Sequence, residues 1–169
     1  YYGIYIGLSV IIISWSDKQL ITLMVFFTFL FVLLFFFLDW EAGWNWSLLS
    51  YTGFWTIKGF IRNLFFNGYH PVFPWFSFFI FGMLIGRKDL TDKTCQKKYL
   101  IICFCLVIIC ESVSIGLTHA LNTTEWQFIF STLSFPSLPL FIISASSGSL
   151  ILIIFCIIIS QKIPQLWIN

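Results

Sequence analysis

Long apolar runs separated by short polar segments dominate the chain. The runs carry few or no charged residues and cover residues 1–14, 20–38, 71–86, 99–117 and 138–159. A helix that crosses a lipid bilayer needs about 20 consecutive, mostly apolar residues. The first run is short, and we expect it to be a span truncated at its start. The pattern predicts an all-α fold, a polytopic transmembrane helix bundle of about five spans.

The composition indicates that the lipid bilayer surrounds most of the chain. Hydrophobic residues make up 59% of it and charged residues 9%, whereas a soluble domain carries roughly 25% charged residues. The net charge of +2 is too small to indicate nucleic-acid binding, and no cysteine has the spacing of a metal site. Because the chain starts at Tyr1 inside an apolar run, we expect residues 1–169 to be one domain, a fragment of a larger bundle. Its partner would then be the missing N-terminal half of the same protein.

The basic residues predict the orientation of the bundle. Five of the nine lie in the loop 87–98. With five alternating spans, Lys18 and Lys162 share the side of that loop, and only Lys58 and Arg62 fall on the other. Lysine and arginine are enriched in cytoplasmic loops. The seven-to-two split therefore predicts that loop 87–98 is cytoplasmic.

A histidine at the start of the third run is the first candidate for chemistry. His70 precedes Pro71, which biases its backbone away from the helical region, and prolines are tolerated in the first turn of the helix that follows. The sequence thus predicts an imidazole beside a helix N-terminus at the outer rim of the membrane, where it is a candidate general base. The alternative is an interfacial histidine without a catalytic role. Asp39 and Trp75 fall on the same predicted side and are candidate substrate-binding residues.

A carboxylate inside the fourth run is the second candidate. Glu111 is costly in a span, by roughly 2.5–3.5 kcal/mol, so we expect it to face the bundle interior. The fifth run carries a serine-rich patch at a similar predicted depth, whose candidate residues are Ser144, Ser146 and Ser147. One interpretation is a polar cavity wall below the outer face, near His70. The other is a single interhelical hydrogen bond that holds the bundle together.

Two further patterns concern packing. Gly82 and Gly86 form a GxxxG motif, which permits close helix approach and predicts homo-oligomer contacts through these glycines. The stretch from Trp55 to Leu64 predicts a helix lying in the membrane interface, because Lys58 and Arg62 fall on one of its faces.

Two blocks of the sequence resemble a known family. YHPVFPWFSFFIFGMLIGR at residues 69–87 and FPSLPLFIISASSGSLILI at residues 135–153 are similar to the C-terminal half of bacterial multi-pass proteins of the heparan-α-glucosaminide N-acetyltransferase-like group. The resemblance implies a membrane acyltransferase that moves an acyl group, often acetyl from acetyl-CoA, to a glycan or lipid-linked acceptor. It also implies a mechanistic histidine. In lysosomal relatives that histidine belongs to an N-terminal block absent from this chain, so His70 is a candidate by position alone.

Acyl-CoA would be a cosubstrate rather than a bound cofactor. Four basic residues of the loop 87–98 are candidates for binding its phosphates: Arg87, Lys88, Lys97 and Lys98. Membrane topology is the stronger explanation of their positions. Two other functions stay open from the sequence. One is a transporter or channel component in which Glu111 and residues 144–149 line a path, and the other is a structural membrane subunit.

Overall fold

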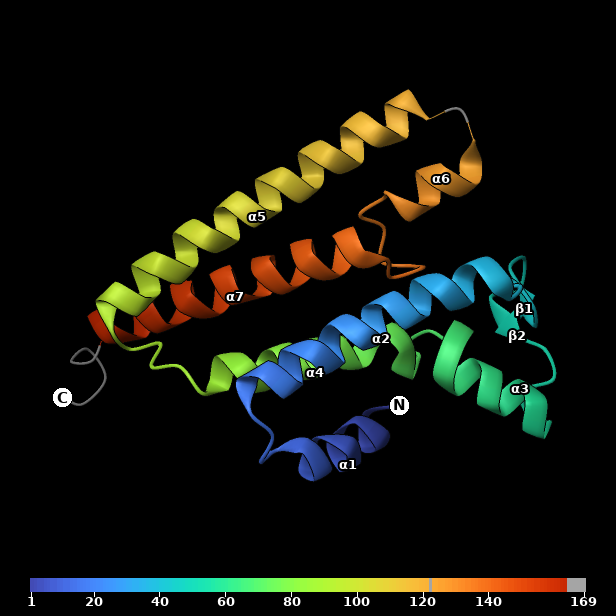
Figure 1. Ribbon diagram of the computed structural model, residues 1–169, viewed down its shortest axis with the longest axis horizontal. Helices are drawn as coiled ribbons and strands as arrows, with labels where there is room; N and C mark the ends of the chain where they lie inside the picture. Colours follow the sequence, from blue (N-terminus) through green and yellow to red (C-terminus); the bar gives the residue numbers. More distant parts are fainter. Residues whose placement is uncertain (122, 164–169) are drawn as a thin grey trace. The chain divides into compact units, whose positions relative to one another are not determined.

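The computed structural model describes residues 1–121 and 123–163, which are mostly helical (Figure 1). The helices are α1 (Tyr2–Ile12), α2 (Asp17–Phe37), α3 (Ile57–Arg62), the π-helical turn η1 (Asn63–Asn67), α4 (Val72–Gly86), α5 (Lys93–Ala120), α6 (Thr124–Ile129) and α7 (Pro139–Lys162). Strands β1 (Trp44–Asn45) and β2 (Ser50–Tyr51) form one antiparallel hairpin. The prediction of an all-α fold is confirmed apart from this hairpin. The chain divides into two compact units, unit 1 (residues 1–84 and 133–139) and unit 2 (residues 85–132 and 140–169).

Three of these helices are long and apolar enough to cross a membrane: α2, α5 and α7. This agrees with an integral membrane protein, but the expected count of five spans is not confirmed. The run 1–14 forms the 11-residue α1. The run 71–86 forms the 15-residue α4, about 22 Å long at 1.5 Å per residue. Helix α4 reaches membrane length only together with residues 57–67, across a bend of 45°. Among the described residues the count is therefore three, or four if this bent pair is one span.

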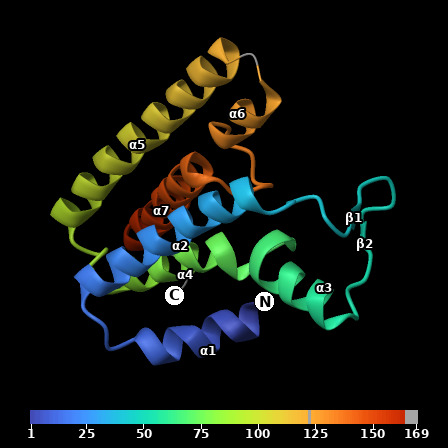
Figure 2. The same cartoon turned by 45° about the vertical axis from the view of Figure 1, so that its right-hand side comes forward.

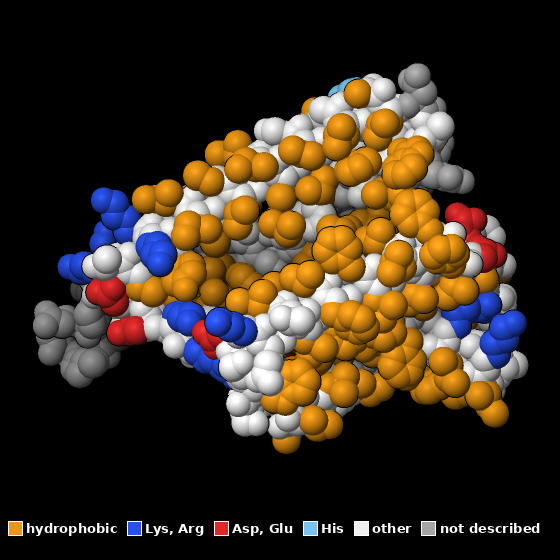
Figure 3. All heavy atoms as spheres, in the orientation of Figure 1, with side chains coloured by type: hydrophobic (Ala, Val, Ile, Leu, Met, Phe, Trp, Pro, Cys, Tyr) orange, Lys and Arg blue, Asp and Glu red, His pale blue; other side chains and the backbone are white. Residues whose placement is uncertain are grey.

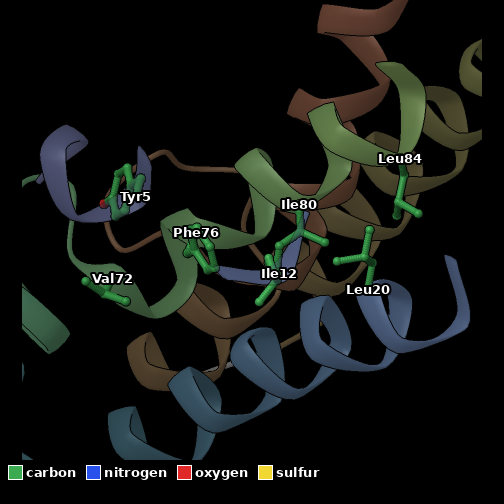
Figure 4. Packing of buried hydrophobic residues seen from close by; sticks show 7 residues of the cluster. All are labelled: Tyr5, Ile12, Leu20, Val72, Phe76, Ile80 and Leu84. Atoms are coloured by element: carbon green, nitrogen blue, oxygen red, sulfur yellow. The ribbon is translucent and has the colours of Figure 1, made fainter. Parts of the chain in front are cut away.

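Unit 1 is built around α1, α2 and α4. Four buried hydrophobic residues of α4 recur every four positions, from Val72 to Leu84, so that they line one side of the helix. They pack with residues of α1 and α2 in a single cluster, shown in Figure 4: Tyr5, Ile12, Leu20, Val72, Phe76, Ile80 and Leu84. One polar contact lies within this apolar region, where the Ser77 hydroxyl is 3.2 Å from the Thr28 hydroxyl and 3.2 Å from the Met24 carbonyl oxygen. Helix α2 begins with a capping box formed by Ser16 and Gln19.

A second cluster closes unit 1 at the other end of α2. Phe31 of α2, Phe66 of η1 and Leu138 are buried against one another. Residues 133–139 therefore belong to the core of unit 1, although they lie far along the chain from its helices. This packing holds η1, and with it the start of α4, against the C-terminal half of α2.

Unit 2 is an antiparallel pair of long helices with α6 folded back on α5. Figures 1 and 2 both show α5 and α7 in this pair. Near one end, the Gln96 side chain donates a hydrogen bond of 3.2 Å to Gln161. Toward the other end, Ser144 of α7 donates one of 2.7 Å to Glu111 of α5. Helix α6 is held by Gln127, whose side-chain amide donates to carbonyl oxygens at the end of α5.

Candidate functional site

His70 lies in the short break between η1 and α4. The residue is half-buried, and its backbone oxygen accepts a hydrogen bond from the Tyr5 hydroxyl. The break follows from the local sequence, because Pro71 has no backbone N–H and disfavours helical geometry at the residue before it. Tyr5 is buried against Phe76 and Phe79, so the bond ties the backbone at His70 to the apolar core.

Aromatic rings surround the His70 imidazole. The Trp75 ring meets it edge to face at a centroid distance of 4.3 Å, and the Tyr2 and Tyr1 rings lie at 6.0 Å and 6.3 Å. The structure therefore brings together two candidate residues, His70 and Trp75. Within the described ranges, no residue forms a hydrogen bond with the imidazole. Such a ring keeps its nitrogen lone pair available for a proton of a bound ligand.

Asn67 satisfies the polar backbone groups beside this break. Its side chain is fully buried, and its amide Nδ2 donates hydrogen bonds of 2.8 Å to the carbonyl oxygens of Trp40 and Ala42. Its Oδ1 accepts one of 2.8 Å from the Tyr51 hydroxyl, and its backbone oxygen accepts one of 2.6 Å from Trp44 Nε1. One asparagine thus joins η1 to the end of α2 and to the hairpin. A buried polar group is tolerated when it is paired in this way.

Arg62 extends the same network. Its Nε donates a 2.7 Å hydrogen bond to the Tyr51 hydroxyl, and its guanidinium lies 5.5 Å from the centre of the Tyr51 ring. The sequence identified Arg62 only as a charge on the outer side and on one face of a predicted interfacial helix. In the structure its Nε holds β2 to α3 through Tyr51.

An aromatic stack covers the hairpin side of the break. The Trp46 ring stacks on the Trp44 ring at 5.0 Å and on the Trp40 ring at 5.5 Å. Phe135 meets the Trp40 ring edge-on at 4.7 Å, and Tyr69 stacks on Phe135 at 5.7 Å. Their mutual packing gives the end of unit 1 a rigid aromatic wall.

Asp39 is less favourably placed than Trp75 for a role in substrate binding. It is exposed, and its Oδ1 accepts a 3.0 Å hydrogen bond from the Glu41 backbone N–H. This is the usual behaviour of aspartate in a turn after a helix. The structure gives Asp39 a local structural role, and its predicted role in substrate binding stays a prediction.

Glu111 is held by two hydroxyl groups. Its Oε1 accepts a 2.7 Å hydrogen bond from Ser144, and its Oε2 accepts one of 2.9 Å from Thr132. The predicted contact between Glu111 and the serine patch is therefore present within unit 2. Ser146 and Ser147, further along α7, are buried. Thr132 was missed because nothing in the mixed polar stretch before α7 distinguishes it. Both side-chain oxygens are therefore paired, as a polar group among apolar helices requires.

The candidate phosphate-binding residues lie at the opposite end of the α5–α7 pair. Arg87, Lys88, Lys97 and Lys98 are all exposed, and the Gln96–Gln161 contact brings Lys162 to the same end. Two acidic residues of this region, Asp89 and Asp92, accept hydrogen bonds from residues two or three positions along the chain. The Thr91 hydroxyl and N–H donate to the Asp89 carboxylate, which lowers its pKa, while Asp92 caps α5 through a 2.8 Å bond from the Cys95 N–H.

The glycines of the GxxxG motif are exposed rather than packed. A Cβ placed on Gly82 or Gly86 would meet no heavy atom of the described residues within 4 Å. Among these same residues, no group of three or more histidine, cysteine, aspartate or glutamate side chains could hold a metal ion. His70 and Glu111 belong to different units, and their grouping at one depth of the membrane stays a prediction.

Comparison with known proteins assigns neither a family nor a function to the chain. No protein-family model, no curated protein and no solved structure matches the chain. The function must therefore be argued from the chemistry of these residues and from the resemblance of the two sequence blocks.

Proposed function

We propose that this chain is part of a polytopic acyltransferase of the bacterial inner membrane. In this proposal it contributes five spans, with α1 and α4 as short spans beside α2, α5 and α7, and the loop 87–98 is cytoplasmic. The enzyme transfers an acyl group, most simply acetyl, from acyl-CoA to a glycan or lipid-linked acceptor on the outer side. The resemblance of residues 69–87 and 135–153 supports the reaction class.

The placement of His70 carries the proposal. Its imidazole lies at a helix break, framed by Trp75 and two tyrosine rings, and forms no hydrogen bond with a described residue. Its backbone is tied to the core by Tyr5. A base needs a fixed position and a free nitrogen lone pair, and aromatic rings provide flat surfaces for a sugar. A half-buried imidazole with a purely structural role is expected to form a hydrogen bond, and the His70 imidazole forms none with a described residue.

The chemistry assigned to His70 is proton transfer. Its imidazole removes the proton of an acceptor hydroxyl or amine, whose oxygen or nitrogen attacks the thioester carbonyl carbon. The new C–O or C–N bond forms as the C–S bond breaks, and the imidazolium returns the proton to the leaving thiolate of CoA. In this proposal the exposed cations Arg87, Lys88, Lys97 and Lys98 bind the CoA phosphates on the cytoplasmic side, and the thioester end of CoA reaches through the membrane to the acceptor.

The direct test uses membranes that contain the full-length protein and acetyl-CoA labelled in the acetyl group. We expect the label to appear in a glycan or lipid-linked product. His70→Ala should lower the transfer rate by at least 100-fold, because positioned acid–base groups contribute about 10²–10⁴-fold. His119→Ala is the matched control, since His119 is an exposed histidine at the end of α5.

Two outcomes would count against this proposal. No transfer to any acceptor offered would contradict an acyltransferase. Unchanged transfer by correctly inserted His70→Ala would instead remove His70 from the mechanism and leave the reaction class standing.

Glu111 supports a second candidate, a transporter or channel component. A paired carboxylate between apolar helices is rare in membranes and often marks an ion or proton path, and here Ser144 and Thr132 provide further polar groups. Flux of protons or monovalent cations into vesicles containing the full-length protein tests it. Flux abolished by Glu111→Gln but unaffected by Asp39→Asn would favour transport.

A further inference from the structure

The hairpin and α3 carry a row of strongly exposed hydrophobic side chains, which we call the apolar edge. Its members and their exposed fractions are Leu48 (73%), Leu49 (65%), Trp55 (94%), Ile57 (82%) and Phe60 (46%). Figure 3 shows hydrophobic side chains beside basic ones over this part of unit 1. Such a density of exposed apolar groups within about a dozen residues indicates a surface that is covered in the working protein.

Three polar side chains of the same segment are turned toward the rest of unit 1. Asn63 and Asn67 are buried, and Arg62 donates to Tyr51 of β2. Helix α3 also approaches the chain after β2 so closely that a Cβ on Gly59 would collide with the Gly53 backbone oxygen. One side of the hairpin and α3 is thus fixed by these contacts, and the apolar edge is what remains outside.

Three environments can be compared for this edge. Water would leave Trp55 and Ile57 almost fully hydrated, which the hydrophobic effect opposes. The hydrocarbon core would surround the exposed charge of Lys58 and the unpaired backbone groups of a two-residue strand pair, which find no partners in lipid tails. The boundary between lipid headgroups and acyl chains accommodates both, since tryptophan prefers that level and lysine reaches the phosphates.

We propose that the hairpin and α3 form an interfacial anchor, with the lipid of the outer leaflet as the partner that covers the apolar edge. Trp55 and Ile57 insert to the level of the upper acyl chains, and Lys58 faces the headgroup phosphates. Residues 57–67 then lie along the membrane surface, and α4 is the part of this bent pair that crosses the membrane. The bent pair of helices is therefore a surface helix followed by a short span, and this holds whether or not the chain transfers acyl groups.

Spin-label accessibility in phosphatidylcholine vesicles tests this anchor. A nitroxide is attached at Ile57→Cys in the full-length protein after its other cysteines have been replaced, and at Glu41→Cys as the matched control, because Glu41 is exposed and lies outside the apolar edge. At position 57 we expect collisions with oxygen, which concentrates in lipid, to exceed collisions with a water-soluble nickel chelate. At position 41 we expect the reverse.

The other outcomes at position 57 would overturn the proposal. A dominant nickel chelate signal would place the edge in water. Low accessibility to both reagents would place it under protein, either a second copy or another partner. A second measurement keeps the native cysteines: vesicles with bromine on the upper acyl chain should quench wild-type fluorescence more strongly than that of Trp55→Phe. Equal quenching of the two proteins would contradict insertion of Trp55.

Discussion

The helix break of unit 1 and the Glu111 site of unit 2 place polar groups among apolar helices in different ways. At the break, the polar groups belong to the backbone, and Asn67 pairs with carbonyl oxygens of Trp40 and Ala42. At Glu111, a single carboxylate sits on an unbroken helix and is paired by two hydroxyls from separate segments. The first arrangement reshapes the chain, whereas the second leaves α5 continuous.

This difference bears on function. A broken helix presents side chains at its gap in positions that a continuous helix does not allow, and His70 occupies such a position with imidazole nitrogens that bond to no described residue. Glu111 has both oxygens occupied, which suits a bond between helices. The comparison therefore favours chemistry at His70 and a structural role at Glu111.

The largest effect should come from the buried asparagine of the break. Asn67→Leu keeps a similar side-chain size but leaves two carbonyl oxygens and the Tyr51 hydroxyl without their partner. Each unsatisfied buried group costs about 1–3 kcal/mol, and we expect a loss of about 3 kcal/mol of unfolding free energy, measured by denaturation in mixed micelles. Asn45→Ala is the control, because the Asn45 side chain bonds only within the exposed turn of the hairpin. Equal losses in both variants would show that the break does not depend on Asn67.

The close approach of α3 to the chain after β2 should be the next most sensitive feature. Gly59→Ala places a Cβ against the Gly53 backbone oxygen, and overpacking of this kind costs about 1–3 kcal/mol. Gly116→Ala in α5 is the matched control, since a Cβ there meets nothing within 4 Å. That variant should be neutral or gain up to about 1 kcal/mol from helix propensity. Thermal unfolding of the two variants in one detergent makes the comparison, and a stable Gly59→Ala would contradict the observed contact.

A double-mutant cycle tests the structural role of Glu111. Glu111→Gln and Ser144→Ala, alone and together, should reveal a coupling of about 1 kcal/mol, within the range measured for hydrogen bonds between membrane helices. The same cycle with Ser149→Ala, a residue with no observed bond to Glu111, should give a coupling near zero. A Glu111–Ser144 coupling near zero would favour the transport hypothesis over the structural one.

The smallest effect on stability is expected at the exposed glycines of α4. A Cβ at position 82 meets no described heavy atom within 4 Å, so Gly82→Leu should be neutral or gain up to about 0.8 kcal/mol of unfolding free energy from helix propensity. If copies of the chain associate through the GxxxG motif, the same variant should abolish energy transfer between labelled copies in vesicles. Energy transfer that survives Gly82→Leu would exclude this face as the contact.

Much of the fold follows from the apolar pattern because long apolar runs form helices in any environment that excludes water. The helices at 17–37 and 139–162 begin and end close to the predicted runs 20–38 and 138–159. The span count was less predictable. Pro71 separates one helical segment from the next, and the apolar pattern alone does not show whether the residues before it continue a span.

The candidate sites were predictable only in part. The polarity of Glu111 and the serine patch was enough to predict their hydrogen bond. The tyrosines around His70 could not be anticipated, because tyrosine in an apolar run is ordinary and Tyr1, Tyr2 and Tyr5 lie far from His70 along the chain. The sequence does not predict the role of Asn67, because its hydrogen bonds depend on the positions of backbone carbonyl groups that the sequence does not show.

The most direct test is to measure which side of the membrane the hairpin and the basic loop 87–98 each face. Native Cys95 stands at the start of α5, and Ser47→Cys in a Cys95→Ser background places a thiol in the exposed hairpin turn. A membrane-impermeant maleimide should label the thiol introduced at position 47 in right-side-out vesicles, and should label Cys95 of the wild type only in inverted ones. Labelling of both positions from the same side would contradict the placement of His70 and the basic loop on opposite faces of the membrane.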